Sequence, residues 1–224
     1  MLQIYEDYRD GKTIDQPHYG NRPVNFDFLG VWDSVGALAF GRTIGDFHRI
    51  NPGNVLRVAH ALALDEERER FEPSYWNKPA GANTQVDEVW FSGCHTNIGG
   101  GYCDTNLSNI ALIWVLKAAQ DAGISIDLRG LPDFDWEKSH SGRRRDSYAE
   151  FYSELGLVGG IAKLFNIKRA ARVIRQSQRI HQSVIEIIQD KTVPGLAPYV
   201  PTARYNGDAL SADVNPGIEP WGVL

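Results

Sequence analysis

The sequence has few of the residues that stabilise small secreted proteins or anchor a chain in a membrane. Its two cysteines, Cys94 and Cys103, are too few for a disulfide framework and favour a reducing compartment. No run approaches the roughly 18 apolar residues that a membrane-spanning helix needs, and the N-terminus lacks the basic and apolar regions of a signal peptide. We therefore predict a cytoplasmic chain without a transmembrane segment.

Positive charge is not in excess. The 23 Lys and Arg residues are outnumbered by 28 Asp and Glu residues, which gives a net charge of -5. Because nucleic-acid binding requires a dominant basic face, nucleic acid is not an expected partner. Two basic clusters, in residues 143–145 and 168–179, are interpreted as solvated helix faces, with contact to anionic lipid headgroups as the alternative.

The apolar pattern predicts an α/β fold. Residues 24–32 and 86–91 alternate and then run apolar, which is typical of strands buried against helices. Residues 54–65 have a helical pattern, and residues 107–122 predict an amphipathic helix that Gly123 ends. The order strand, helix, strand, helix favours a parallel sheet with crossover helices. We expect only two or three strands and an uncovered sheet edge.

The two ends of the chain have weaker strand signals. Residues 2–9 are interpreted as the end of a helix and residues 11–23 as a loop. Further helices are predicted at residues 145–155, 157–165, 169–177 and 180–190, followed by an irregular tail from residue 193. The predicted organisation is thus a sheet-containing core over residues 1–140 and a mainly helical region over residues 141–224 packed on the same domain.

Polar residues follow both predicted strands. Asp33 and Ser34 come after the first, and His95, Thr96 and Asn97 after the second. Since parallel strands present their carboxyl ends at one edge, these clusters are expected to face each other. A buried Asp can accept the Nδ1 proton of a His and leave Nε2 as a general base. The alternative readings are a capping turn for Asp33 and a structural loop histidine for His95.

Two other kinds of chemistry have weaker support. Cys94, His95, Cys103 and Asp104 do not have the spacing of the usual zinc sites, so neither a metal nor a cofactor is predicted. The sequence also contains no Gly-x-Ser-x-Gly, the sharp turn that presents a nucleophilic serine beside its histidine. The glycine run at residues 99–101 permits positive φ angles but lacks the features of a phosphate-binding loop.

Several sequence blocks occur in the order of one known family. They lie at residues 28–37, 60–66, 88–91, 99–102, 107–112 and 180–184, and the first includes Gly-Val-Trp-Asp ending at Asp33. This pattern resembles the Tle-like phospholipase effectors of type VI secretion and their uncharacterised α/β-hydrolase relatives. The resemblance implies that Asp33 is the triad acid and His95 the triad base. It also implies that the chain corresponds to the portion of an α/β-hydrolase core after the nucleophile turn.

The sequence also departs from the family pattern. His95-Thr96-Asn97-Ile98 stands where relatives usually have His-Ser-Asp-Val, so one carboxylate is replaced by an amide. If that carboxylate tunes the histidine, Asn97 reduces the expected activity. His60, Asp65, Glu66 and His181 also match family positions, and we interpret them as structural.

Three hypotheses follow. The first is the acid-and-base portion of a lipid ester hydrolase, inactive alone, and either encoded as a fragment or completed by a separate upstream polypeptide that carries the serine. The second is a non-catalytic remnant that binds a lipid or protein partner through the inherited cleft. The third, a metal-assisted hydrolase using Asp33, His95 and Asp104, lacks a convincing ligand set. We favour the first, with a lipid or ester substrate and export by type VI secretion without a signal peptide.

Overall fold

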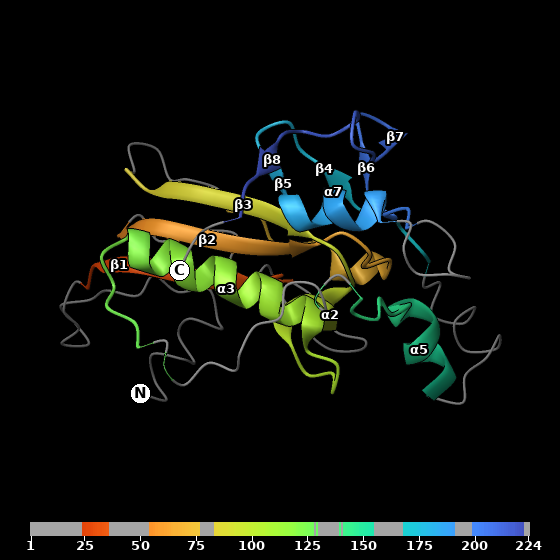
Figure 1. Cartoon of the computed structure of the whole chain (residues 1–224), viewed down its shortest axis with the longest axis horizontal. Helices are drawn as coiled ribbons and strands as arrows, with labels where there is room; N and C mark the ends of the chain where they lie inside the picture. The colour runs from red at the N-terminus through yellow and green to blue at the C-terminus, as the bar shows by residue number, and fades with distance from the viewer. Residues whose placement is uncertain are drawn as a thin grey trace, which may run out of the picture.

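A five-stranded sheet with the order β1-β2-β3-β5-β8 organises the chain (Figure 1). Its strands are β1 (Phe26–Trp32), β2 (Val55–Ala63), β3 (Gln85–Phe91), β5 (Arg179–His181) and β8 (Ile218–Glu219), and neighbouring strands are parallel. The structure is a computed structural model that describes residues 24–35, 54–76, 83–127, 129, 139, 141–154, 168–190 and 199–221. The predicted α/β class is confirmed, with more strands than expected.

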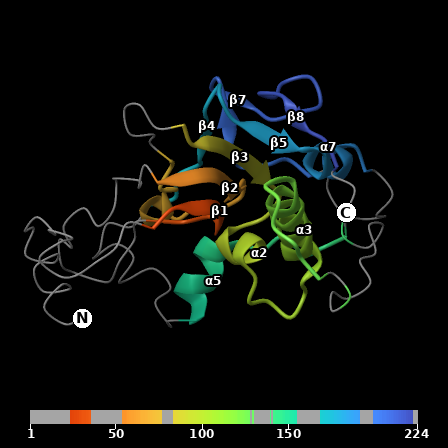
Figure 2. The ribbon, with the colours of Figure 1, turned by 90° about the vertical axis from the view of Figure 1, so that its left-hand side faces the viewer.

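Helices flank this sheet, and a small second sheet accompanies it. The helical elements are η1 (Glu69–Phe71), α2 (His95–Gly99), α3 (Asn106–Asp121), α5 (Ser147–Glu154) and α7 (Gln182–Gln189). Strands β4 (Val173–Ile174), β6 (Arg204–Tyr205) and β7 (Asp208–Ala209) form the second sheet in the order β4-β6-β7. Figure 2 shows the strands of the main sheet stacked in order, with α3 on one side.

The helix predicted over residues 54–65 is wrong, because this segment contains β2. The strand lies between β1 and β3, and its residues from Val58 to Leu64, apart from His60, are apolar and fully buried. A central parallel strand is covered on both faces and therefore has a continuous apolar sequence without alternation. Such a run cannot be distinguished from a buried helix by its periodicity.

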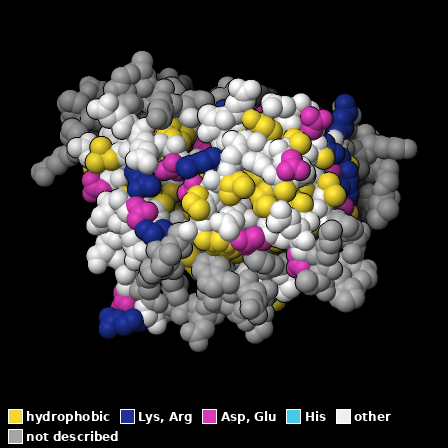
Figure 3. Space-filling view, turned by 45° about the horizontal axis from the view of Figure 1, so that its top comes forward, with side chains coloured by type: hydrophobic (Ala, Val, Ile, Leu, Met, Phe, Trp, Pro, Cys, Tyr) yellow, Lys and Arg dark blue, Asp and Glu magenta, His cyan; other side chains and the backbone are white. Residues whose placement is uncertain are grey.

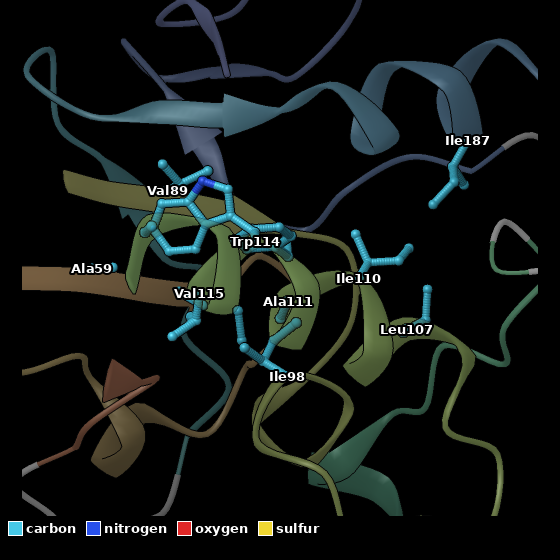
Figure 4. Close-up of a cluster of buried hydrophobic side chains, with 13 residues drawn as sticks. Ala59, Val89, Ile98, Leu107, Ile110, Ala111, Trp114, Val115 and Ile187 are labelled. Carbon is cyan, nitrogen blue, oxygen red and sulfur yellow. The ribbon is translucent and has the colours of Figure 1, made fainter. Parts of the chain in front are cut away.

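Helix α3 covers one face of the sheet, as its amphipathic pattern predicts. Trp114 and Val115 belong to the same buried cluster as Ala59 of β2 and Val89 of β3 (Figure 4). The helix lies so close to β1 that a Cβ atom on Gly30 would be 2.7 Å from Cγ1 of Val115. Glycine at this position therefore sets the distance between helix and sheet.

The prediction of a mainly helical region after residue 140 is only partly correct. Helices α5 and α7 lie within two predicted segments, but Arg169 forms a β-bridge and residues 173–174 form β4 in place of the predicted helix. Residues 199–221 contain short strands. The predicted helices at residues 2–9 and 157–165 and the loop at residues 11–23 lie outside the described residues.

The surface of the described residues is mixed in character. In Figure 3, hydrophobic side chains form a broken band across the face, with charged side chains mainly at its two sides. Among the described helices, none is both long and apolar enough to cross a bilayer.

The close approach at Gly30 can be tested by Gly30→Ala. The added methyl group must displace a β-branched side chain of the core, and such overpacking typically costs about 1–3 kcal/mol. We expect the free energy of unfolding in urea to fall by that amount. Gly99→Ala is the matched control, because a Cβ atom added at Gly99 would meet no heavy atom within 4 Å beyond its chain neighbours and the backbone of its own helix. Equal stability of the two variants would contradict the packing argument.

Candidate active site

Asp33 lies immediately after β1, where the chain turns away from the sheet. Its φ angle is 43°, in the left-handed region that few residues other than glycine, Asn and Asp adopt. Its backbone N–H donates to the Ala61 carbonyl at 2.7 Å, and its Oδ1 accepts the Ala63 N–H at 2.9 Å. The carboxylate is thereby fixed at the end of β2 and is fully buried.

His95 follows β3 and begins the short helix α2. The structure brings its imidazole to Asp33 across the end of β2, with 2.7 Å between Nδ1 and Oδ2. The edge of the ring packs against Phe71, with 5.4 Å between ring centroids. The imidazole is 30% exposed, and Nε2 has no hydrogen-bond partner among the described residues. The ring is thus held through Nδ1, and part of the side chain is exposed.

The protonation of Asp33 sets the tautomer of His95. Burial raises the pKa of the Asp33 carboxyl, but the hydrogen bond from His95 and the charge and hydrogen bonds of Arg172 together hold it below its ordinary value. An ionised carboxylate only accepts hydrogen bonds, so Nδ1 of His95 carries the proton. In the neutral imidazole this leaves the lone pair on Nε2, which is the arrangement of a general base.

Arg172 is the residue that sequence reasoning missed. It falls in a segment predicted to be a solvated helix face, but its side chain is only 4% exposed. Both terminal nitrogens donate hydrogen bonds to the Asp33 carboxylate, at 2.5 Å and 2.9 Å. The same nitrogens donate to the carbonyls of Ala63 and Phe71 at 2.7 Å and 2.6 Å. The available signal was local, since Arg172 is flanked on both sides by Ala or Val rather than by polar residues.

Asn97 fixes the loop that carries His95. Its Oδ1 accepts backbone N–H groups of Cys94 and Arg145, both at 3.3 Å, and its Nδ2 donates to the Arg143 carbonyl at 3.2 Å. A carboxylate could not make the last bond, so the amide suits this loop. Gly93 leaves room for Asn97, because its φ is 111° and a Cβ there would lie 2.5 Å from Asn97 Cβ.

Two carboxylates that follow β2 lie at the same end of the sheet as Asp33 and His95. Glu66 is buried, and its carboxylate accepts hydrogen bonds from the Ser147 hydroxyl at 2.8 Å and from the His95 N–H at 3.3 Å. Burial raises the pKa of Glu66, but the hydrogen bonds and charge of Arg68 outweigh this effect and hold the pKa below its ordinary value. Asp65 accepts the Gly93 N–H and the Tyr199 hydroxyl, both at 2.7 Å, and burial raises its pKa. Both carboxylates have structural partners, although their expected helical setting was wrong.

The two other histidines with family matches are also structural. Nε2 of His60 accepts the Ser34 N–H at 3.2 Å, and its Nδ1 lies 3.8 Å from a Glu88 carboxylate oxygen. His181 precedes α7, accepts the Ser183 N–H at 3.3 Å and stacks on Phe91 with 4.8 Å between centroids. Burial lowers the pKa of His181 to about 3, so it is neutral at physiological pH.

The other candidate residues are engaged elsewhere. Cys94 is buried, its thiol contacts Oδ1 of Asn97 at 3.3 Å, and burial raises its pKa, which disfavours the thiolate. The Asp104 carboxylate accepts the N–H groups of Asn106 at 3.1 Å and Arg143 at 2.9 Å. The described residues contain no group of three or more His, Cys, Asp or Glu placed to hold a metal ion.

Comparison with known proteins adds one positive finding. A family model described as the catalytic domain of Tle1-like phospholipase effectors of type VI secretion matches residues 6–118, about half of the chain. The match includes both Asp33 and His95, whereas Arg172 lies outside it. No curated protein and no solved structure matches the chain significantly.

The Asp33–Arg172 ion pair can be tested by Asp33→Asn. This change leaves a buried guanidinium without its counter-charge, and breaking a buried pair on one side typically costs about 3–5 kcal/mol. We expect urea unfolding to show a loss of that size. Adding Arg172→Met is expected to restore only part of it, since the Ala63 and Phe71 carbonyls also lose a donor. Asp127→Asn removes an exposed carboxylate from an ion pair with Arg129 and serves as the control; equal effects of Asp33→Asn and Asp127→Asn would contradict the argument.

His181 gives a pH-dependent prediction. Its pKa in the folded chain is about 3 and the ordinary pKa of a histidine is 6.5, so between these values the unfolded chain binds a proton that the folded chain does not. Stability due to this group is therefore complete above pH 6.5 and is lost as the pH falls. We expect His181→Asn to reduce the difference in unfolding free energy between pH 7 and pH 5 by about 2 kcal/mol. An unchanged difference would show that His181 is protonated in the folded state.

Proposed function

Since the chain belongs to the Tle1-like phospholipase effector family of type VI secretion, we propose that Asp33 and His95 are the acid and base of a serine-type lipid ester hydrolase. One observation carries this assignment. The Nδ1 side of His95 is held at 2.7 Å by a fully buried carboxylate, while its ring remains 30% exposed. A histidine with only a structural role has no need of a partly exposed ring whose Nε2 lacks a hydrogen-bond partner among the described residues.

The chemistry follows from this geometry. Nε2 takes the proton of a serine hydroxyl as the hydroxyl oxygen attacks the ester carbonyl, and it then gives that proton to the leaving alcohol. Asp33 remains ionised and stabilises the imidazolium that forms between the two steps. Water repeats the sequence on the acyl-serine and releases the fatty acid. Each step requires Nε2 to face the reacting oxygen, and Nε2 has no hydrogen-bond partner among the described residues that would compete for it.

We assign the nucleophile to a Gly-x-Ser-x-Gly turn supplied from outside these 224 residues, which contain no such motif. The support is chemical, because no described hydroxyl or thiol is hydrogen-bonded to Nε2. The chain by itself is then inactive as a triad esterase. It acts on lipid once an upstream polypeptide segment places the serine, and its export by type VI secretion follows from the family.

Arg172 acts in this scheme as a positioning residue. Its two hydrogen bonds prevent the Asp33 carboxylate from rotating, and its charge keeps that carboxylate ionised. The same charge offsets part of the attraction between Asp33 and an imidazolium. Arg172 therefore contributes mainly to the orientation and tautomer of His95 rather than to stabilising its charged form.

The alternative is a non-catalytic protein that binds lipid through the same cleft. The absence of a nucleophile beside His95 among the described residues favours the binding protein. The geometry of the Asp33–His95 pair, called the dyad below, favours the hydrolase. The two differ in what happens when a serine is supplied.

An activity assay separates them. The purified chain is tested with a chromogenic short-chain ester and with phospholipid vesicles, alone and together with the polypeptide encoded immediately upstream. We expect no turnover by the chain alone and, in the presence of the second polypeptide, turnover that His95→Ala and Asp33→Asn abolish. Cys103→Ser, at an exposed thiol, is the control and should retain full activity.

Two results would contradict the proposal. Turnover by the chain alone that is lost in His95→Ala would mean that the nucleophile lies within these residues. No turnover after addition of the second polypeptide would favour the binding protein.

A further inference from the structure

A cavity of about 260 Å³ adjoins the dyad. It lies between the segment that contains η1 and the segment leading into β4. Its charged and aromatic lining comprises Arg68, Glu69, Phe71, Glu72, Tyr75, Arg172 and Arg175. Two of these residues also touch the dyad, since Phe71 packs on the His95 ring and Arg172 binds Asp33. The cavity and the dyad therefore have these two residues, Phe71 and Arg172, in common.

The arginines of this lining differ in the hydrogen-bond donors that they offer to the cavity. Arg172 offers no accessible donor, because its Nε is buried and both terminal nitrogens are bonded to Asp33 and to the Ala63 and Phe71 carbonyls. The Arg175 guanidinium stacks on the Tyr75 ring at 3.6 Å, and it has no carboxylate partner within the described residues. Stacking uses the face of a guanidinium and leaves its N–H edges available, the arrangement that suits phosphate oxygens.

The lining also carries negative charge. Glu69 and Glu72 are both exposed on the cavity side of the segment around η1. A simple anion would be repelled by these carboxylates, whereas a ligand with an anionic and a cationic end would complement both sets of charges. The cavity approaches the lower limit of typical small-molecule sites, which is about 300 Å³. It is thus large enough for more than a phosphate ion.

We propose that this cavity binds the phosphate-and-ammonium headgroup of a zwitterionic phospholipid. The inference rests on the proposed function, because it names the substrate class of the same site. Arg175 binds the phosphate, and Glu69 and Glu72 face the ammonium group. In a glycerophospholipid the ester groups lie only a few bonds from the phosphate, so a headgroup held beside Phe71 places an ester near His95.

Headgroup binding can be measured without catalysis. The whole chain is titrated by calorimetry with phosphocholine, inorganic phosphate and choline, and by sedimentation with phosphatidylcholine vesicles. The soluble probes report on the shared chemistry, and the vesicles show whether a lipid-borne headgroup is accepted. We expect phosphocholine to bind at least tenfold more tightly than phosphate or choline, and the vesicles to bind as well. Equal affinity for phosphate and phosphocholine, or no binding of phosphocholine, would overturn the proposal.

Three variants locate the site. Arg175→Gln is expected to weaken phosphocholine binding about tenfold, since it removes a charged donor at the surface without disturbing Asp33. Glu72→Gln should weaken phosphocholine but not inorganic phosphate. Arg70→Gln is the matched control, because Arg70 is an exposed arginine of η1 that does not line the cavity. Vesicle binding that is unchanged in Arg175→Gln would place the lipid contact elsewhere and overturn the proposal.

Failure of this inference is distinguishable from failure of the proposed function. If the completed enzyme hydrolyses esters but phosphocholine neither binds nor inhibits, the headgroup site is wrong and the dyad assignment stands. If phosphocholine binds as described and no turnover occurs after the second polypeptide is added, the headgroup site stands without the hydrolase.

Discussion

The buried carboxylate of Asp33 is the constraint on which the site depends. It connects β1 with His95, 62 positions away, and with Arg172, 139 positions away. An isolated carboxylate would not remain charged in such a place, because the loss of hydration is not compensated. Here four donors surround it: the Ala63 N–H, Nδ1 of His95 and the two terminal nitrogens of Arg172. The Asp33 carboxylate therefore both orients His95 and holds the segment around Arg172 against the sheet.

Two further carboxylates, Glu66 and Asp65, fix the backbone of the segment that carries His95. Glu66, at the end of β2, binds the His95 N–H, and Asp65 beside it binds the Gly93 N–H. The loop between β3 and α2 is thus fixed at two points by side chains from the neighbouring strand. His95 is located through its main chain by one carboxylate and through its ring by another. This explains why three acidic residues gather at one end of the sheet without forming a metal site among the described residues.

The sequence predicted the elements whose patterns have a single interpretation. Residues 24–32 and 107–122 have clear alternation or a clear helical period with a terminating glycine, and both predictions are confirmed. Residues 54–65 were mistaken for a helix because burial on both faces removes the alternation of a strand. Arg172 lies in a basic cluster that is interpreted from the sequence as a solvated helix face, whereas in the structure it pairs with Asp33 and the next two residues form β4, which pairs with β6. The apolar neighbours of Arg172 are a local sign of burial, but nothing local identifies Asp33 as its partner.

The pair of Asp33 and His95 was expected to meet because both follow parallel strands, and that topological argument needs no knowledge of Arg172. For the proposed general base, however, orientation matters more than proximity. A general base must present one nitrogen to the reacting proton in a fixed direction, and small errors of placement cost large factors in rate. In this chain the tautomer, the ring plane and the backbone of His95 are each set by a separate residue, Asp33, Phe71 and Glu66. The orientation of His95 is therefore set by contacts within the described residues, as the proposed role of a general base requires.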